Sequence, residues 1–258
     1  MNELKIRNID HLGIIAGIVD QIGLVEIVNG EIGENSQEKI SAGIVVKAMI
    51  LNGLGFVSAP LYLFSKFFEG KAIEHLLGEE IKAKDLNDDK LGRVLDKLYK
   101  VGLTKLFIKI ALAAVKIFGV KMDNLHLDSS SMSVEGEYLE KGEEEGILKI
   151  THGYSRDKRP DLKQFMIDLI CTGDGDIPLY FRVGEGNESD QKVFAQIIKE
   201  YQKGWQIEAL FVADAALYTE ENIQVLGETS WLSRVPSTLN EALSLKQELN
   251  EAAFKDSE

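Results

Sequence analysis

The chain has 258 residues, of which 45% are hydrophobic and 28% are charged, and only four are prolines. This composition excludes a disordered chain and is sufficient for two modest domains, each with its own core. The formal net charge of -13 disfavours strong non-specific binding to nucleic acid, whose phosphates select basic surfaces.

The N-terminal region lacks the pattern of a targeting segment. Glu3 and Asp10 are acidic, whereas a signal peptide begins with basic residues. The apolar run from Leu12 to Val19 is too short to span a bilayer. The single cysteine, Cys171, cannot form an intramolecular disulfide, which fits a reducing compartment. We therefore expect a cytoplasmic protein that does not enter a membrane.

Residues 9–119 have the apolar spacing of amphipathic helices throughout. Cap and stop residues predict four of them: from the Asn35–Ser36 cap to Gly53, from Pro60 to Gly70, from the Asn87 cap to Gly102, and over Leu103–Phe118. Several helices with short connections are typical of an orthogonal bundle. We therefore predict an all-helical domain over residues 1–120, with the aromatic residues of the second helix packed in its core: Tyr62, Phe64, Phe67 and Phe68.

Strands and turns replace this pattern from Asn124 onward. The predicted order is a strand over Leu125–Asp128, strands over Leu162–Thr172 and Ile177–Val183 joined as a hairpin, a helix over Asp190–Tyr201, a strand over Glu208–Asp214, a helix from the Thr219 cap through Val225, and a strand over Ser230–Val235. Three antiparallel strands followed by two strand units linked through helices form the ribonuclease H-like arrangement.

The predicted fold class is therefore α plus α/β, a helical bundle followed by an incomplete ribonuclease H-like mixed sheet with flanking helices. The core is expected over residues 121–236 and an amphipathic tail over residues 237–258. In this arrangement the first strand is central and the fourth lies beside it.

Two aspartates each end an apolar run in this region, Asp128 after Leu125–Leu127 and Asp214 after Leu210–Ala213. The predicted strand order brings both carboxylates to the same end of the sheet. Carboxylates are hard oxygen ligands suited to Mg²⁺ (or Mn²⁺), which can activate water or a 3′-hydroxyl against a phosphodiester. Either aspartate alone is more often a turn or cap residue, but the pair in this strand order favours a metal site.

A third carboxylate, which such a site usually needs on a helix after the fifth strand, is not evident. The glutamates of the tail have the pattern of a solvated helix face: Glu241, Glu248, Glu251 and Glu258. The sequence therefore predicts a site with two of its three acidic residues.

Several segments carry longer motifs: Asn52–Phe56, Leu86–Arg93, His126–Ser131, Gly153–Gln164, Gly186–Asp190 and Val212–Ala216. Together they resemble the DDE-type insertion-sequence transposases of bacteria and archaea, in the branch with an inserted domain before the catalytic glutamate. The resemblance covers nearly the whole chain. Its most specific part is the run Gly153–Gln164, whereas the segments around the two aspartates would be weak alone.

This resemblance implies that Asp128 and Asp214 are catalytic residues that bind Mg²⁺ or Mn²⁺. It also implies DNA partners, namely the terminal inverted repeats of the element and the target DNA, bound by a homodimer or a higher synaptic assembly. Basic and aromatic residues of the long motif would hold the DNA backbone, although a structural turn explains them equally well: Tyr154, Arg156, Arg159 and Lys163. The family's catalytic glutamate follows an inserted domain, and no matching signature follows Pro236, so we expect a truncated chain.

Two functions remain open from the sequence. The first is a transposase that cleaves DNA at element ends and joins the freed 3′-hydroxyl to a target. The second is a non-catalytic remnant that binds element ends or complete transposase and acts as a competitor. A phosphatase with Asp128 as its nucleophile is disfavoured, because Ser130 stands where a further aspartate would be required.

Overall fold

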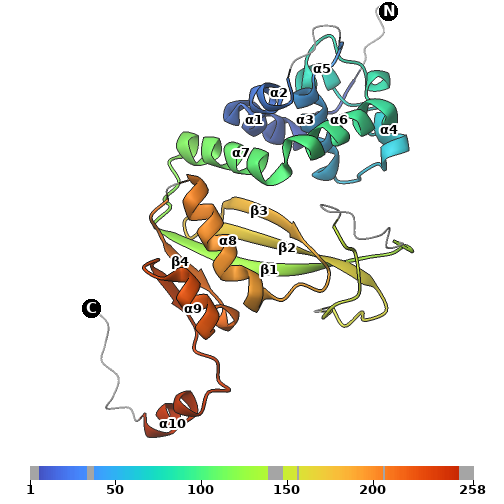
Figure 1. Cartoon of the computed structure of the whole chain (residues 1–258). Helices are drawn as coiled ribbons and strands as arrows, with labels where there is room; N and C mark the ends of the chain where they lie inside the picture. Colours follow the sequence, from blue (N-terminus) through green and yellow to red (C-terminus); the bar gives the residue numbers. More distant parts are fainter. Residues whose placement is uncertain (1–5, 34–37, 139–147, 156, 206, 250–258) are drawn as a thin grey trace, which may run out of the picture. The chain divides into compact units, whose positions relative to one another are not determined.

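The computed structural model describes residues 6–33, 38–138, 148–155, 157–205 and 207–249 (Figure 1). The chain divides into two compact units, Met1–Gly119 and Val120–Glu258. The division falls next to residue 120, where the sequence predicts a domain boundary. The predicted fold class is confirmed, since the first unit is helical and the second contains a mixed five-stranded sheet.

The first unit is built from helices around one apolar core. Its elements are α1 (Leu12–Ile22), α2 (Leu24–Ile32), α3 (Ala42–Gly53), the 3-10 turn η1 (Leu61–Leu63), α4 (Phe64–Phe67), α5 (Ile73–Leu77), the 3-10 turn η2 (Ala83–Asp85), α6 (Asp88–Val101) and α7 (Leu103–Phe118). The most completely buried side chains include Val28, Val45, Leu51, Leu76 and Leu91. No single helix of the described residues is long and apolar enough to cross a membrane. The pair formed by α1 and α2 passes the same test of length and composition, but the two helices are bent by 56° relative to each other.

Local cap chemistry decides where two of these helices begin. The prediction for α6 is confirmed, because the Asn87 side chain accepts a hydrogen bond from the backbone N–H of Lys90 at 2.9 Å. The predicted start of α3 after Ser36 is wrong, because the helix begins at Ala42 with Ser41 as its cap. Asn35 and Ser36 themselves lie outside the described residues.

A close approach between α2 and α3 explains this later start. The buried N–H of Gly43 donates to the Asn29 side chain at 2.7 Å, and the same side chain donates to the Ser41 hydroxyl at 3.1 Å. A Cβ on Gly43 would lie 2.3 Å from the carbonyl oxygen of Val25, so only glycine permits this approach. The start of α3 is thus set by its neighbour in space.

The aromatic helix predicted after Pro60 is also broken. Residues 61–67 form η1 and the short α4, and the helix does not continue to Gly70. Three of the four aromatic side chains pack as predicted, namely Phe64, Phe67 and Phe68. Tyr62 is 74% exposed, so its predicted place in the core is wrong.

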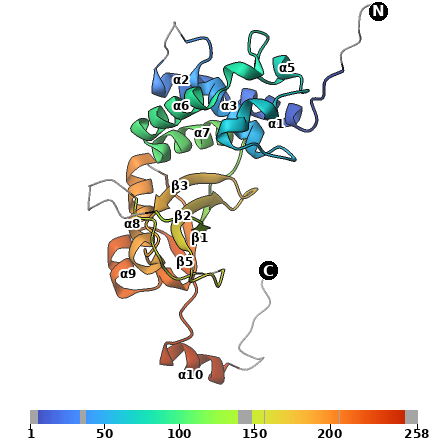
Figure 2. The same cartoon turned by 90° about the vertical axis from the view of Figure 1, so that its right-hand side faces the viewer.

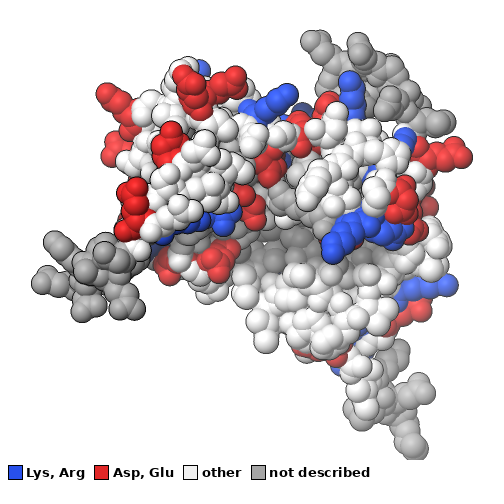
Figure 3. Space-filling model, turned by 90° about the horizontal axis from the view of Figure 1, so that it is seen from below, with Lys and Arg blue, Asp and Glu red and all other residues white. Residues whose placement is uncertain are grey.

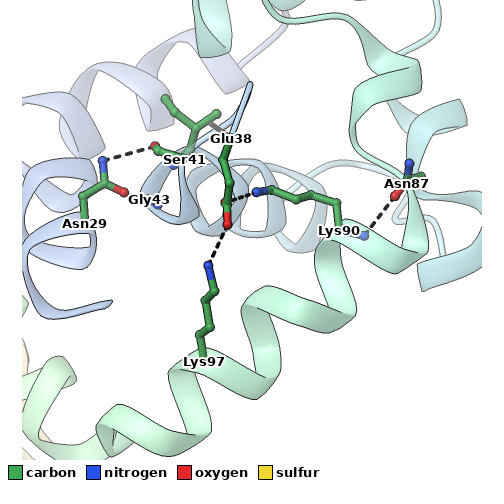
Figure 4. Close-up of polar contacts among 8 residues, drawn as sticks. Asn29, Glu38, Ser41, Gly43, Asn87, Lys90 and Lys97 are labelled. Carbon is green, nitrogen blue, oxygen red and sulfur yellow. Dashed lines mark hydrogen bonds and ion pairs between the residues drawn. The ribbon is translucent and has the colours of Figure 1, made fainter. Parts of the chain in front are cut away.

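Glu38 lies in the segment that precedes α3, and its side chain links that segment to α6 (Figure 4). Its carboxylate pairs with Lys90 and, at 2.8 Å, with Lys97. The hydrogen bond from Lys90, followed by that from Lys97, lowers the pKa of Glu38 to about 2. Because the pKa in the folded state lies below that of the unfolded chain, the stabilisation is present above about pH 4.5 and is lost as pH falls toward 2.

We therefore expect Glu38→Gln to lower the free energy of unfolding at pH 7 by about 1–2 kcal/mol, after allowance for solvent screening. The difference from wild type should shrink as pH falls from about 4.5 toward 2. Urea unfolding followed by far-UV circular dichroism at several pH values measures it, with the exposed Glu79→Gln as control. A difference that is constant with pH would contradict the ion-pair explanation.

The second unit contains one sheet in the order β3-β2-β1-β4-β5. Its elements are β1 (Asn124–Val134), β2 (Lys163–Thr172), β3 (Pro178–Gly184), α8 (Asp190–Trp205), β4 (Leu210–Ala213), the 3-10 turn η3 (Ala215–Leu217), α9 (Glu220–Leu226), β5 (Trp231–Ser233) and α10 (Asn240–Glu248). β1, β2 and β3 are antiparallel, whereas β4 and β5 run parallel to β1. This is the predicted ribonuclease H-like topology, with β1 central and β4 beside it.

The two faces of this sheet differ in burial. Helices α8 and α9 lie on one side of it (Figures 1 and 2). Tyr201 of α8 meets Phe211 of β4 and Tyr180 of β3 edge to face. On β1, the residues of this face are buried, including Leu125 and Leu127, whereas those on the opposite face of β1 and β2 are partly or fully exposed. Asp128 lies on the opposite, exposed face.

Candidate functional site

Strand register brings Asp128 and Asp214 together. β1 and β4 are parallel, with Leu127 opposite Ala213; Asp128 follows Leu127 within β1, and Asp214 is the first residue after β4. Neighbouring strands lie about 4.8 Å apart, so the two aspartates occupy adjacent backbone positions where β4 ends beside β1. Both residues are exposed. The strand order predicted from the sequence required this placement.

Backbone N–H groups hold one oxygen of each carboxylate. Asp128 Oδ1 accepts from Ser129 N at 2.9 Å, and Asp214 Oδ1 accepts from Ala216 N at 2.8 Å as the cap of η3. Within the described part of the chain, neither Oδ2 atom has a hydrogen-bond or ion-pair partner. Each carboxylate is therefore oriented by its own backbone and keeps one acceptor oxygen for a ligand.

These two carboxylates fit a hard divalent cation. Mg²⁺ is commonly bound by one or two carboxylates, with waters and substrate phosphate oxygens as its other ligands. Among the described residues, no group of three or more His, Cys, Asp or Glu side chains is placed to hold a metal ion. Glu241 and Glu248 lie on α10, which has no buried residue, and Glu251 and Glu258 lie outside the described residues.

A buried polar chain runs behind Asp128 on the α8 side of the sheet. The Ser129 hydroxyl donates to Asp168 Oδ1, and Arg182 Nη1 donates to Asp168 Oδ2 at 2.5 Å. Arg182 Nη2 also binds both oxygens of Glu188, at 2.7 and 2.9 Å. Asp168 is only 1% exposed, and Arg182 supplies the positive charge that compensates its buried carboxylate.

No role was predicted from the sequence for the residues of this buried polar chain. A signal was present in β2, where Asp168 alternates in phase with Met166 and Ile170 on the buried face. An acidic residue at such a position requires a buried partner, and Arg182 lies directly opposite it on β3. This buried polar chain links β1, β2 and β3 at the position just after Asp128.

The four residues predicted to hold DNA differ in their contacts. Tyr154 is 86% exposed. Arg159 is paired with Asp161 at 2.8 Å, and this hydrogen bond raises the pKa of Arg159 above its usual value. Lys163 Nζ donates to the backbone oxygens of residues 137 and 138, each at 2.8 Å. Arg156 lies outside the described residues.

These contacts support the structural-turn interpretation for Arg159 and Lys163 and leave Tyr154 available to a ligand. On the surface drawn in Figure 3, Lys and Arg side chains lie in small groups with Asp and Glu close by. That distribution agrees with the acidic net charge of -13. DNA affinity from charge alone is therefore expected to be low.

Comparison with known proteins finds a match of part of the chain to one family model and a similarity to several solved structures. The family model DUF4277, a domain of unknown function, matches residues 4–112. None of the curated proteins with which the chain was compared matches it. The piggyBac transposase synaptic complex with hairpin DNA is similar at 12% identity with a TM-score of 0.42, over 97% of this chain and 47% of that chain.

Two structures of the Mos1 transposase are also similar. The paired-end complex with left transposon end shares 12% identity with a TM-score of 0.28, and the pre-cleavage transpososome shares 11% with a TM-score of 0.26. Each match covers 78% of this chain and 60% of that chain. This chain therefore spans about half to three-fifths of the length of these proteins.

Proposed function

We propose that this chain is a DDE-type insertion-sequence transposase, acting in the cytoplasm, whose residues 121–236 form the catalytic core. It cleaves DNA at element ends and joins the freed 3′-hydroxyl to target DNA, with Mg²⁺ or Mn²⁺ held by Asp128 and Asp214. The observation that supports the proposal is the register of β1 and β4, in which Leu127 lies opposite Ala213 and each of these residues is followed by one of the two aspartates. The long motifs of the sequence favour the same family.

Asp128 and Asp214 would hold the cation, and when bound it would supply charge stabilisation for an attacking water and for the leaving oxygen of an in-line displacement. The chain's own residues hold that charge in place. The N–H groups of Ser129 and Ala216 orient the carboxylates, and the Ser129 hydroxyl joins β1 to the buried Asp168. Asp128 lies within β1 and Asp214 is the cap of η3 directly after β4, so both carboxylates are held by regular structure, which limits the reorganisation needed for catalysis.

The proposed partners are the terminal inverted repeats of the element and the target DNA. A homodimer or higher synaptic assembly would bring two element ends together. Because the chain is acidic, the protein should bind DNA mainly through contacts near the site, with an affinity that falls as salt rises.

A second candidate function is a non-catalytic competitor that binds element ends or complete transposase. The observation in its favour is that the described residues place only two acidic side chains at the site. Both candidates use the same fold, and they differ in whether phosphodiester bonds are broken.

Nicking of supercoiled plasmid DNA by the purified chain separates the two. We expect open circles to form in Mn²⁺ or Mg²⁺ and not in excess EDTA, because the proposed water activation requires the cation. Binding of plasmid without nicking in either metal would instead identify the competitor. Absence of both binding and nicking would exclude the transposase and also a competitor that acts by binding element ends.

A further inference from the structure

A cavity of about 560 Å³ lies in the second unit, where segments distant in the sequence meet. Its lining comes from Gly153–Tyr154, from Gln164 and Met166 of β2, from residues 187–191 at the start of α8, and from Ala216. Two of these segments belong to the motifs Gly153–Gln164 and Gly186–Asp190, which the metal site does not use. Both motifs therefore contribute residues to one cavity, and the volume of this cavity is in the range of small-ligand sites.

The wall of this cavity is tightly built around Gln164, which is 1% exposed. Its Nε2 donates to Gly186 O at 2.8 Å and to Tyr154 O at 3.3 Å, so one side chain ties both motifs together. A Cβ on Gly153 would lie 2.0 Å from Gly186 O, so the backbones approach too closely for any side chain. The cavity is thus formed before a ligand arrives.

The lining selects a neutral ligand with hydrogen-bonding edges. The Gln164 N–H groups already donate to Gly186 and Tyr154, so the exposed amide groups of Asn187 and Gln191 supply the donors and acceptors for a ligand. None of the described lining residues is basic, and the charged ones, Glu188 and Asp190, are acidic, which disfavours a phosphate group. A nucleobase has the opposite character, since it is uncharged, planar and edged with donors and acceptors that pair with amide side chains.

The cavity also lies next to the proposed metal site. Ala216 lines it, and the N–H of the same residue orients Asp214. Asn222 Nδ2 joins the two sides of the cavity by donating to Gln191 O at 2.9 Å and to Ala216 O at 3.4 Å. The pairing of β4 with β1 ends at Ala213, so the part of β1 after Leu127 has no β4 residue paired beside it, and Ala216 follows shortly after this point.

We infer that this cavity receives one unpaired nucleobase of the DNA strand whose phosphodiester lies at Asp128 and Asp214, with Tyr154 stacking on that base. This inference rests on the proposed function and names a base contact for it. Tyr154 is one of the lining residues and is 86% exposed, so its ring is accessible to a planar group. A base that is already unpaired enters at little cost, because no base pair has to be broken.

Binding of two single-stranded probes tests the base contact. One probe is a thymidylate of about eight nucleotides, a length within the usual site size, and the other is a tetrahydrofuran abasic strand of the same length. In EDTA and low salt, we expect the full chain to prefer the thymidylate by roughly 5- to 100-fold. Tyr154→Ala should remove that preference without changing affinity for the abasic strand, whereas Tyr154→Phe should keep it.

The matched control is Tyr62→Ala, another exposed tyrosine that lies in the first unit, and it should retain the full preference. Equal binding of both probes by a wild-type protein that nicks plasmid DNA would overturn the base pocket alone. An equal loss on both probes in Tyr154→Ala would assign Tyr154 to the backbone and overturn it as well. Failure to bind either probe, together with absence of nicking, would overturn the proposed function.

Discussion

Asp128→Asn is expected to lower the rate of metal-dependent plasmid nicking by at least about a thousandfold. The asparagine amide has nearly the same shape as the carboxylate, so the backbone of β1 should remain unchanged. The amide carries no negative charge, however, so the variant should bind the cation poorly. The stabilisation that the cation would give to developing charge is worth several kcal/mol. Each 1.36 kcal/mol corresponds to a tenfold change in rate, which sets the expected magnitude.

Asp214→Asn should have an effect of similar size, because Asp214 directly follows β4, beside the position of Asp128 on β1. The matched control is Asp123→Asn, an exposed aspartate just before β1 whose replacement removes the same charge. It should nick at the wild-type rate. If Asp128→Asn also nicks at that rate, the two carboxylates do not form the metal site, and the proposed mechanism is wrong.

Arg182→Met is expected to lower the free energy of unfolding of the second unit by about 3–5 kcal/mol. The variant keeps an apolar stem but leaves Asp168, which is 1% exposed, without its cation. A buried charge without a partner is strongly destabilising, because the desolvation cost of the carboxylate is no longer compensated. Both tryptophans, Trp205 and Trp231, lie in this unit, so urea unfolding followed by tryptophan fluorescence measures its stability.

The control for this variant is Arg159→Met, which breaks the arginine–aspartate pair with Asp161 at the surface. Both of those side chains are at least half exposed, so the pair should contribute almost nothing measurable, and unfolding should match wild type. Equal behaviour of the two variants would show that the buried chain from Ser129 to Glu188 does not stabilise the sheet.

Patterns that act over a few residues were predictable from the sequence. The Asn87 cap and the ends of α7 depend on neighbours within one helical turn, and both agree with the structure. The alternation over Leu162–Thr172 likewise predicted a strand, and the structure has β2 over Lys163–Thr172. The start of α3 was missed because it depends on Asn29, twelve residues before Ser41, through a contact that helix periodicity does not describe.

The length of β1 was underestimated for a related reason. The strand was predicted to end at Asp128, because the serines that follow have no apolar alternation. In the structure it continues to Val134, paired with β2 along its whole added length. Ser129 and Ser131 are buried on the α8 side of the sheet, where the pairing places them. Strand pairing therefore extends a segment that its own composition would have ended.

For the candidate site, the sequence by itself singled out the two aspartates, because each ends an apolar run, and the order of its elements matched the ribonuclease H-like arrangement, in which their strands are neighbours. Only the tertiary structure decided how the site is supported and what lies beside it. The partners of Asp168 and the lining of the cavity come from segments tens of residues apart, and such contacts form only when the sheet and α8 pack together.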